Sequence, residues 1–396
     1  MIDVSGELPA TVRPMPDWIV PLADVRLSEE DVQAVASVYR GGWLSQGPRV
    51  AEFERAFADF TGARAAIAVA SGTAALQLAL ALLDLNPGDE VILPSLTFAA
   101  TAATIVQAGA TPVFADVRAT DAPWLSCERV RESIGPRTRA IVNVAYAGHP
   151  GETLALADLA AERGLTLIED AAHAAGAWAG PRHVGTIGRL GAFSFFANKN
   201  LPLGEGGMLV TDDQELAERA RLLRSHGLSM DTWRRHHGPV VHDYDVVEPG
   251  FNLRLDEPRA ALGTRLLERL AADNRRRAEL AERYVDALRD LDGARPVLVP
   301  DDDVTCAWHI FPLLLRCDLD RAAFRAFLHR AGVQTSVHYP PLHMTTAFSL
   351  RSAPALSCTE EYGRRTVTVP LFPHMTRLDE ECIICAVKDA IESLTR

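Results

Sequence analysis

The sequence predicts an α/β protein in which a large domain with a mostly parallel β-sheet precedes a smaller α+β domain. Short apolar runs alternate with helical windows from about residue 28 to 215, which is typical of repeated strand–helix units. A long helical window then spans 258–290, and beyond Pro296 the pattern changes to mixed strands and helices. We therefore predict a large domain over residues 1–255 and, over residues 256–396, a long linking helix with the small domain.

Two helices begin the pattern. Ser28 starts a helix through Val38, with acidic residues in the first turn, where the helix dipole favours them. A second helix spans Arg49–Phe60 and stops at Gly62. The apolar runs predicted as strands are Ala65–Ala70, Glu90–Pro94, Thr111–Ala115, Ala140–Ala145, Leu165–Glu169, Gly191–Phe195 and Gly207–Thr211. The helical windows among and after them are Thr73–Leu83, Ala99–Ala108, Thr153–Arg163 and Gln214–Ser225.

The second part of the chain has its own strands and helices. We predict strands at Trp308–Arg316 and Gln334–His338, a helix at Arg321–Ala331, and a last helix from Asp379. Cys382 and Cys385 form a C-x-x-C in that last helix, without a second pair or nearby His ligands. We interpret this pair as part of a buried helix face and expect no metal site.

Composition narrows the possible partners. The 396 residues include 40 Lys and Arg against 52 Asp and Glu, which gives a net charge of −12. Phosphate binding needs a concentrated basic face, so this balance argues against nucleic acid as a partner. The uncharged stretches Ala65–Leu83 and Val91–Ala115 are interrupted by turn residues, so we assign no membrane span. The N-terminus lacks the basic and apolar regions of a signal peptide, and we expect a cytoplasmic protein.

Lys199 is the first candidate for chemistry. It follows the apolar segment Gly191–Phe196 and precedes Gly204-Glu205-Gly206-Gly207, which places it in a loop between two buried strands. A lysine there can point into a cleft, where desolvation lowers its pKa and frees the amine to form a Schiff base with an aldehyde cofactor. A lone loop lysine is more often exposed to solvent, so other residues must support this interpretation.

Asp170 supports it. This residue ends the apolar run Leu165–Glu169, at the edge of a parallel sheet where ligands bind. Pyridoxal phosphate needs an acid opposite its pyridinium nitrogen and a lysine at its aldehyde. An aspartate at a strand end, 29 residues before a cleft lysine, supplies both. Taken alone, Asp170 also fits a helix N-cap.

A turn of small residues suits the cofactor's phosphate. Ser71-Gly72-Thr73 lies between a strand and a helix, so backbone N–H groups can approach a phosphate at the helix N-terminus. Ser194 and Asn198 flank the lysine loop and offer hydroxyl and amide donors to the same group. Phe98 follows the next strand and can stack on a pyridine ring, although a core aromatic is an open alternative.

Several motifs stand in one order along the chain: Gly42-Trp43-Leu44-Ser45-Gln46-Gly47, Ser71-Gly72-Thr73, Pro94-Ser95-Leu96-Thr97-Phe98, Glu169-Asp170-Ala171-Ala172-His173, Phe193-Ser194-Phe195 with Asn198-Lys199-Asn200, Gly204-Glu205-Gly206-Gly207, Gly250-Phe251-Asn252-Leu253-Arg254 and Val337-His338-Tyr339-Pro340-Pro341-Leu342-His343. In order and spacing they resemble the DegT/StrS family of pyridoxal-phosphate sugar aminotransferases. The resemblance covers about residues 19–390. It implies a fold-type I transferase whose large domain has a seven-stranded, mostly parallel sheet.

The resemblance also implies roles for residues. Lys199 would be the Schiff-base lysine and Asp170 the partner of the ring nitrogen. The other cofactor-binding residues implied are Gly72, Thr73 and Ser194 at the phosphate, Phe98 on the ring, His173 beside the phenolic oxygen, and Asn252 at the neighbouring subunit's phosphate. Members of this family are homodimers with active sites at the subunit boundary. The substrate-binding residues implied are Trp43, Ser45, Tyr146, Arg254, His338 and Tyr339.

The resemblance implies L-glutamate as amino donor and a keto group on a nucleotide-linked sugar as acceptor. His173 stands where the family frequently has glutamine, and together with Gly204–Gly207 it favours amination at C4 of a dTDP-4-keto-6-deoxyhexose. Ala145 stands before Tyr146 where the family often has histidine, which leaves the sugar open. A C3 sugar or a keto-cyclitol of aminoglycoside biosynthesis is an alternative, and so is a cofactor-bound regulatory protein. In dehydratases of this fold histidine replaces the lysine, so Lys199 argues against that activity.

A loop rich in Gly, His and Arg follows the large sheet. His226, His236, His237 and His242 surround it without the spacing of a tetrahedral metal site. We interpret it as a loop that closes over a nucleotide sugar. The arginines that could contact a diphosphate are Arg234, Arg235 and Arg254, although the first two suit a solvated surface equally well.

Overall fold

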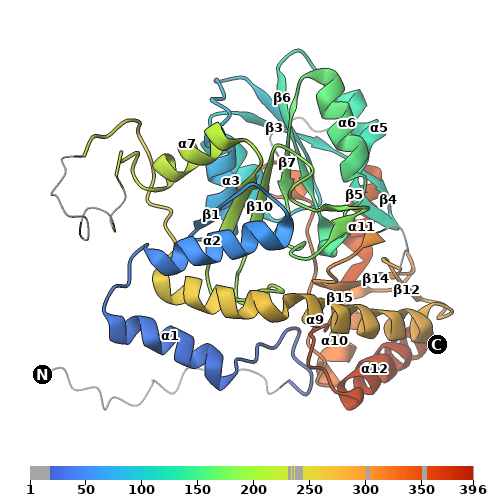
Figure 1. Cartoon of the computed structure of the whole chain (residues 1–396). Helices are drawn as coiled ribbons and strands as arrows, with labels where there is room; N and C mark the ends of the chain where they lie inside the picture. The colour runs from blue at the N-terminus through green and yellow to red at the C-terminus, as the bar shows by residue number, and fades with distance from the viewer. Residues whose placement is uncertain are drawn as a thin grey trace, which may run out of the picture.

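The computed structural model describes residues 18–230, 233, 236, 244–299, 304–349 and 355–395. A seven-stranded sheet occupies the upper part of the view in Figure 1, and the long helix α9 (Glu257–Leu288) runs beneath it toward the C-terminal part. No helix among the described residues combines the length and the apolar character that crossing a membrane would require.

Two helices begin the described chain, α1 (Glu29–Gly41) and α2 (Pro48–Thr61). The Ser28 hydroxyl accepts the N–H of Asp31, whose carboxylate in turn accepts the N–H of Ser28, so α1 starts with a capping box. Gly42 and Gly62 end the two helices in the left-handed conformation that glycine adopts without steric cost. Both helices were predicted from the sequence and are confirmed.

The main sheet has the strand order β1-β11-β10-β7-β6-β2-β3. Its neighbours pair in parallel except that β11 is antiparallel to both β1 and β10. This confirms the mostly parallel, seven-stranded sheet. The strands are β1 (Ala65–Val69), β2 (Glu90–Pro94), β3 (Thr111–Ala115), β6 (Thr138–Val144), β7 (Thr166–Asp170), β10 (Leu190–Ser194) and β11 (Gly207–Thr211).

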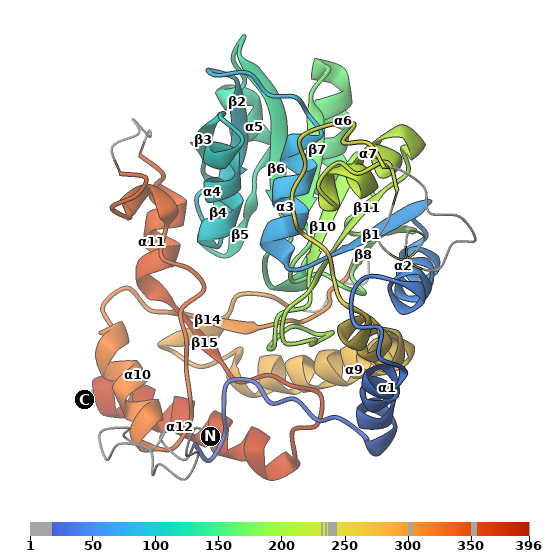
Figure 2. The same cartoon turned by 90° about the vertical axis from the view of Figure 1, so that its left-hand side faces the viewer.

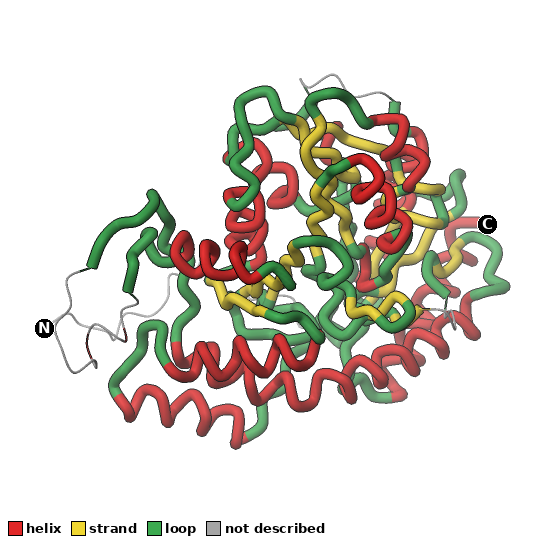
Figure 3. Tube along the Cα trace, turned by 45° about the horizontal axis from the view of Figure 1, so that its top comes forward, coloured by secondary structure: helices red, strands yellow, loops and turns green. Residues whose placement is uncertain are grey.

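Helices cover both faces of this sheet, as Figures 2 and 3 show. In β1, Ile67 packs with α3, α4 and α7, whereas its neighbours Ala66 and Ala68 pack with α2 and α9 on the opposite face. The alternation follows from the two-residue period of a strand. Further along the sheet, Ile141 packs on that second face with α5 and α6. The helices are α3 (Gly72–Ala81), α4 (Ala99–Gln107), α5 (Cys127–Ser133), α6 (Thr153–Arg163) and α7 (Gln214–Arg224).

The C-terminal part forms a second core around a three-stranded antiparallel sheet of order β12-β14-β15. Helix α9 contacts α1 and α2 and then leads into this sheet. The division of the chain at residue 255 stays a prediction. The elements are β12 (Ala294–Pro296), β14 (Phe311–Leu315), β15 (Thr366–Val369), α10 (Arg321–Arg330), α11 (Ser357–Arg365) and α12 (Arg377–Thr395).

Short elements complete the description. They are the strands β4 (Val117–Ala119), β5 (Ala122–Leu125), β8 (Trp178–Ala179), β9 (Arg182–His183) and β13 (Val304–Thr305), and the 3-10 turns Tyr146–Gly148 and Leu342–Met344.

Two predictions for this part are wrong. Gln334–His338 forms no strand, because its backbone partners are split: Gln334 N–H donates to Val20, while Ser336 pairs with Thr368 in an isolated bridge. In α12, Cys382 is half-buried but Cys385 is exposed, so the C-x-x-C does not lie wholly on a buried face.

Candidate active site

Asp170 lies at the centre of the main sheet, at the C-terminal end of β7. It pairs with Val144 of β6 on one side and with Ala192 of β10 on the other. The carboxyl ends of parallel strands form the crevice where ligands bind in open α/β sheets. A cavity of about 400 Å³ opens there, and both Asp170 and Lys199 line it.

Lys199 stands in the loop between β10 and β11, as predicted. Its backbone N–H donates to the carbonyl of Phe196, which fixes the turn, and its Nζ lies 3.4 Å from Nε2 of His309. Burial lowers the pKa of the Lys199 ammonium to about 8, although the nearby Asp170 carboxylate opposes the shift. A substantial fraction of the amine is therefore unprotonated near neutral pH.

Two donors hold the Asp170 carboxylate. The Thr101 hydroxyl donates to Oδ2 at 2.8 Å, and the N–H of Ala172 donates to Oδ1 at 3.2 Å. Burial raises the pKa of this carboxyl, whereas both hydrogen bonds and the Lys199 charge favour the ionised form. Each carboxylate oxygen keeps a lone pair for a further donor from the cavity.

The N-terminus of α3 opens on the same cavity. Ser71 caps the helix, since its hydroxyl accepts the N–H of Ala74 and its carbonyl accepts that of Ala75. The N–H groups of Gly72 and Thr73 have no acceptor among the described residues, and both residues line the cavity. A Cβ on Gly72 would come within 2.7 Å of the Ser194 Cβ, so only glycine lets these two segments meet.

Aromatic and imidazole side chains complete the wall. Phe98 is 59% exposed at the rim, and its ring centroid lies 6.0 Å from that of Tyr339. The Tyr339 hydroxyl meets His173 Nε2 at 2.9 Å, and His173 Nδ1 accepts the N–H of Ala147 at 3.3 Å. Burial, followed by the Lys199 charge, lowers the pKa of His173 well below its ordinary value. His173 is thus a neutral ring that donates from Nε2 to Tyr339.

Comparison with known proteins identifies this arrangement. The sequence model of the DegT/DnrJ/EryC1/StrS aminotransferase family matches residues 25–388. The chain belongs to this family. It is 39% identical to the spore coat polysaccharide biosynthesis protein SpsC of Bacillus subtilis (strain 168) over 378 residues. The matched region covers 92% of this chain and 95% of SpsC.

Solved structures agree with the assignment. The aminotransferase TlmJ from Streptoalloteichus hindustanus is 35% identical, with a TM-score of 0.89, over 96% of this chain and 100% of TlmJ. Helicobacter pylori PseC, an aminotransferase involved in the biosynthesis of pseudoaminic acid, is 28% identical, with a TM-score of 0.87. The match covers 94% of this chain and 99% of PseC. This DegT/DnrJ/EryC1/StrS member is a sugar aminotransferase of fold type I that depends on pyridoxal phosphate.

The cavity fits that cofactor on its own chemistry. The free N–H groups of Gly72 and Thr73 suit a phosphate, and the ionisable pair Lys199 and Asp170 suits an aldehyde and a ring nitrogen. Asn198 also lines the cavity, and the amide of this half-buried side chain is a further donor for an anion there. These donors were expected from the sequence.

Several residues expected at the substrate do not line the cavity of their own chain in this DegT-family member. Tyr146 is buried, with its hydroxyl bound to the His338 carbonyl at 2.6 Å and to Tyr362 at 2.9 Å, so it supports the cavity wall without lining it. Trp43 packs edge-on against Trp233, and Ser45 is exposed. None of the three lines the cavity of its own chain.

Two further expected residues lie in the segment just before α9. Asn252 is exposed, and its backbone forms an isolated antiparallel β-bridge with Ser225. The backbone of Arg254 forms such a bridge with Val69 at the end of β1. Neither lines the cavity of its own chain, whereas His338 and Tyr339 do. Arg234, Arg235, His237 and His242 lie outside the described residues.

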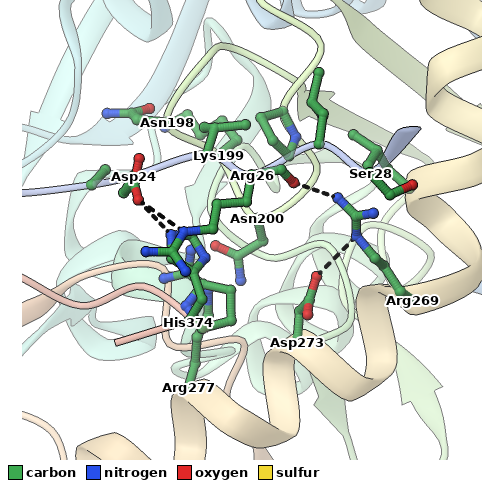
Figure 4. Close-up of a pocket in the computed structure, with 16 residues that line it drawn as sticks. Asp24, Arg26, Ser28, Asn198, Lys199, Asn200, Arg269, Asp273, Arg277 and His374 are labelled. Carbon is green, nitrogen blue, oxygen red and sulfur yellow. Dashed lines mark hydrogen bonds and ion pairs between the residues drawn. The ribbon is translucent and has the colours of Figure 1, made fainter. Parts of the chain in front are cut away.

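A second cavity of about 380 Å³ adjoins the lysine loop and shares Asn198 and Lys199 with the first (Figure 4). Its charged groups face one another. His374 Nε2 lies 2.8 Å from the Asp24 carboxylate, and Arg269 lies 3.6 Å from Asp273. Two carboxylates, Asp24 and Asp273, line it together with four cationic side chains, Arg26, Lys199, Arg269 and Arg277. We assign no ligand to this cavity.

Sequence reasoning missed two polar residues of the site. Thr101 in α4 holds Asp170, and His309 before β14 meets Lys199. Thr101 lies one helical turn after Phe98, so the strand–helix connection that pointed to Phe98 could have pointed to it as well. His309 is 110 residues from Lys199, and no local pattern indicates that the fold brings the two together.

Proposed function

We propose that this sugar aminotransferase moves the amino group of L-glutamate to the C4 keto group of a dTDP-4-keto-6-deoxyhexose. The observation that carries the proposal is the single cavity that holds the Lys199 amine, the Asp170 carboxylate and the free N–H groups of α3. The choice of C4 rests on His173, which stands where the family frequently has glutamine, and on Gly204–Gly207.

Pyridoxal phosphate, when bound, supplies an electron sink for negative charge on the carbon next to the transferred nitrogen. In the proposal Gly72, Thr73 and Ser194 hold its phosphate and Phe98 stacks on its ring. His173 would lie beside the ring's phenolic oxygen. Asp170 would bind the ring nitrogen and, as an anion, keep a proton on it.

Lys199 is the residue that moves protons. With a pKa of about 8, Nζ can both take up and release a proton at neutral pH, as a general acid/base must. Its partly buried position keeps the amine away from bulk water, so it exchanges its proton with the substrate carbon in preference to solvent. Lys199 is thus both the attachment point of the cofactor and the acid/base of each half-reaction.

The proposal includes a homodimer with shared sites. Phe98 and Phe196 line the cavity and are 59% and 45% exposed, so a single chain leaves large apolar side chains uncovered at the rim. Asn252, Trp43 and Ser45 lie off the cavity of their own chain, where a second copy can use them.

The acceptor is tested with a panel of nucleotide-linked 4-keto and 3-keto sugars. The purified enzyme with pyridoxal phosphate is expected to lose its visible absorption band on addition of glutamate and to regain it only with a 4-keto sugar. The position of nitrogen in the product is then read by NMR. Nitrogen at C3, or turnover of a keto-cyclitol alone, would replace the C4 proposal with its alternatives. A stable band that glutamate leaves unchanged would favour a regulatory protein.

Shared sites are tested by subunit complementation. Lys199→Ala and Asn252→Ala chains are each expected to be inactive as pure dimers. A mixed dimer has one site with both residues intact, so mixing the two variants should produce activity that neither parent shows. A mixture that exchanges subunits and stays inactive would contradict the shared site.

A further inference from the structure

His309 lies directly behind Lys199 and away from the cavity. It is 5% exposed and does not line the cavity. Its backbone is fixed, since its N–H donates to the carbonyl of Ala147 at 2.9 Å and that of Ala307 donates to Gly148 at 3.0 Å. The ring has two neighbours on the cavity side: Nζ of Lys199 lies 3.4 Å from its Nε2, and the ring of His173 packs against it with a centroid distance of 4.3 Å.

A chain of amides fixes which ring nitrogen of His309 carries hydrogen. Asn274 Nδ2 donates to the Ala175 carbonyl at 2.8 Å, so its Oδ1 faces Asn200. Asn200 Nδ2 donates to that Oδ1 at 2.8 Å and to the Ala307 carbonyl at 2.7 Å. A carbonyl only accepts, so neither amide can be turned over without losing these bonds.

The orientation of Asn200 then decides the tautomer. Its Oδ1 lies 3.1 Å from His309 Nδ1 and can only accept, so Nδ1 bears the hydrogen. Nε2 of the neutral ring is left with a bare lone pair that faces the Lys199 amine. Burial, followed by the Lys199 charge, lowers the pKa of His309 well below its ordinary value.

We propose that His309 is a positioning residue for the aminotransferase reaction: its Nε2 accepts one N–H of Lys199 and so directs the amine toward the cavity. This inference rests on the proposed function of Lys199. An amine that donates one hydrogen backward keeps its lone pair and remaining hydrogens on the opposite side, where cofactor and substrate would lie. The Asn274–Asn200 pair anchors the ring, which ties the lysine to the rigid helix α9.

The test compares His309→Leu with His309→Gln. Leucine removes the acceptor, whereas the Oε1 of glutamine can accept from Lys199 at a similar reach. We expect His309→Leu to slow the glutamate half-reaction about 10- to 100-fold, with little change in KM, and still to form the visible cofactor band. His309→Gln should recover most of the lost rate.

A second readout needs no turnover. The chain has only two lysines, Lys199 and the exposed Lys388, so amine labelling of the full-length, cofactor-free protein gives two resolved peptides. An ammonium donates a stronger hydrogen bond than a neutral amine, so the His309 acceptor stabilises the protonated form of Lys199. Losing this acceptor should lower the labelling midpoint of Lys199, the pH at which labelling is half-maximal, by about one pH unit. His309→Gln should restore it, and a purely structural role for His309 would not shift this midpoint.

A second buried histidine, His183, provides a control for loss of stability. His183 bonds to Gly176 and Val184 and does not line the cavity, so His183→Leu is expected to lower stability without moving the Lys199 midpoint. The inference is overturned if His309→Leu keeps the wild-type rate and midpoint, or if glutamine is as defective as leucine. Absence of a cofactor band in the wild type would overturn the proposed function of Lys199 instead.

Discussion

The amine of Lys199 should react with an acylating reagent as a group of pKa about 8. The experiment labels the full-length, cofactor-free protein with trace reagent across pH 6–11 and measures the Lys199 peptide by mass spectrometry. Lys388, on the exposed face of α12, is the internal reference in the same sample. Only these two lysines occur in the sequence, so assignment is unambiguous.

The magnitude follows from the burial of Lys199. At pH 7.4, about one fifth of an amine with pKa near 8 is unprotonated, against about one in a thousand for an ordinary lysine, a difference of roughly 200-fold. Burial is the main cause, and the Asp170 carboxylate opposes it. Asp170→Asn removes that opposition, so it should move the Lys199 midpoint to lower pH.

Either of two results would contradict the effect of burial on Lys199. A Lys199 midpoint equal to that of Lys388 would mean that the cavity does not desolvate the amine. A midpoint that rises in Asp170→Asn would mean that the carboxylate does not act on Lys199 as its position requires.

Other predictions concern activity and stability. Asp170→Asn should slow the glutamate half-reaction at least about 100-fold, measured by stopped-flow absorbance, because a neutral amide cannot hold the ring proton; a rate near that of the wild type would contradict this. Glu169 accepts the N–H groups of Gly185, Ile187 and Gly188, so Glu169→Ala should cost about 3–5 kcal/mol in urea unfolding, and a loss below 1 kcal/mol would refute it. Burial lowers the pKa of His183 to about 4, so as pH falls from about 6.5 to 4 the unfolded chain binds a proton that the folded chain does not, and stability should fall by about 3 kcal/mol. His183→Gln should remove that part of the pH dependence, and an unchanged slope would exclude His183 as its source.

Much of the fold could be predicted because short apolar runs bounded by turn residues leave few alternatives. The β2 and α6 ranges were predicted to the residue, as Glu90–Pro94 and Thr153–Arg163. Helices α5 and α11 were missed. With 7 residues α5 is too short to show a clear period, and the buried face of α11 consists of Thr359, Tyr362 and Gly363, which do not form a run of apolar residues.

The segment Gln334–His338 shows a different limit. Its pattern suits a strand, but the fold offers Val20 on one side and a single bridge to Thr368 on the other. Strand formation depends on continuous pairing with a neighbour, and the segment's own sequence does not contain that information.

The site was predictable where one loop or strand end carries the chemistry, as with Lys199 and Asp170, which line one cavity. It was not predictable where the tertiary fold brings distant residues together. His309 reaches Lys199 across 110 residues, and Tyr146, chosen by motif, turns its hydroxyl to His338 and away from the cavity.

The function proposed for this aminotransferase depends on Lys199 carrying the cofactor. The direct test adds pyridoxal phosphate, reduces the enzyme with borohydride to fix the cofactor covalently, and maps the labelled peptide. The label is expected on the peptide of Lys199 and should be lost in Lys199→Ala. A label on Lys388 or on the N-terminal amine, or a Lys199→Ala enzyme that still aminates a keto sugar at near-normal rate, would contradict it.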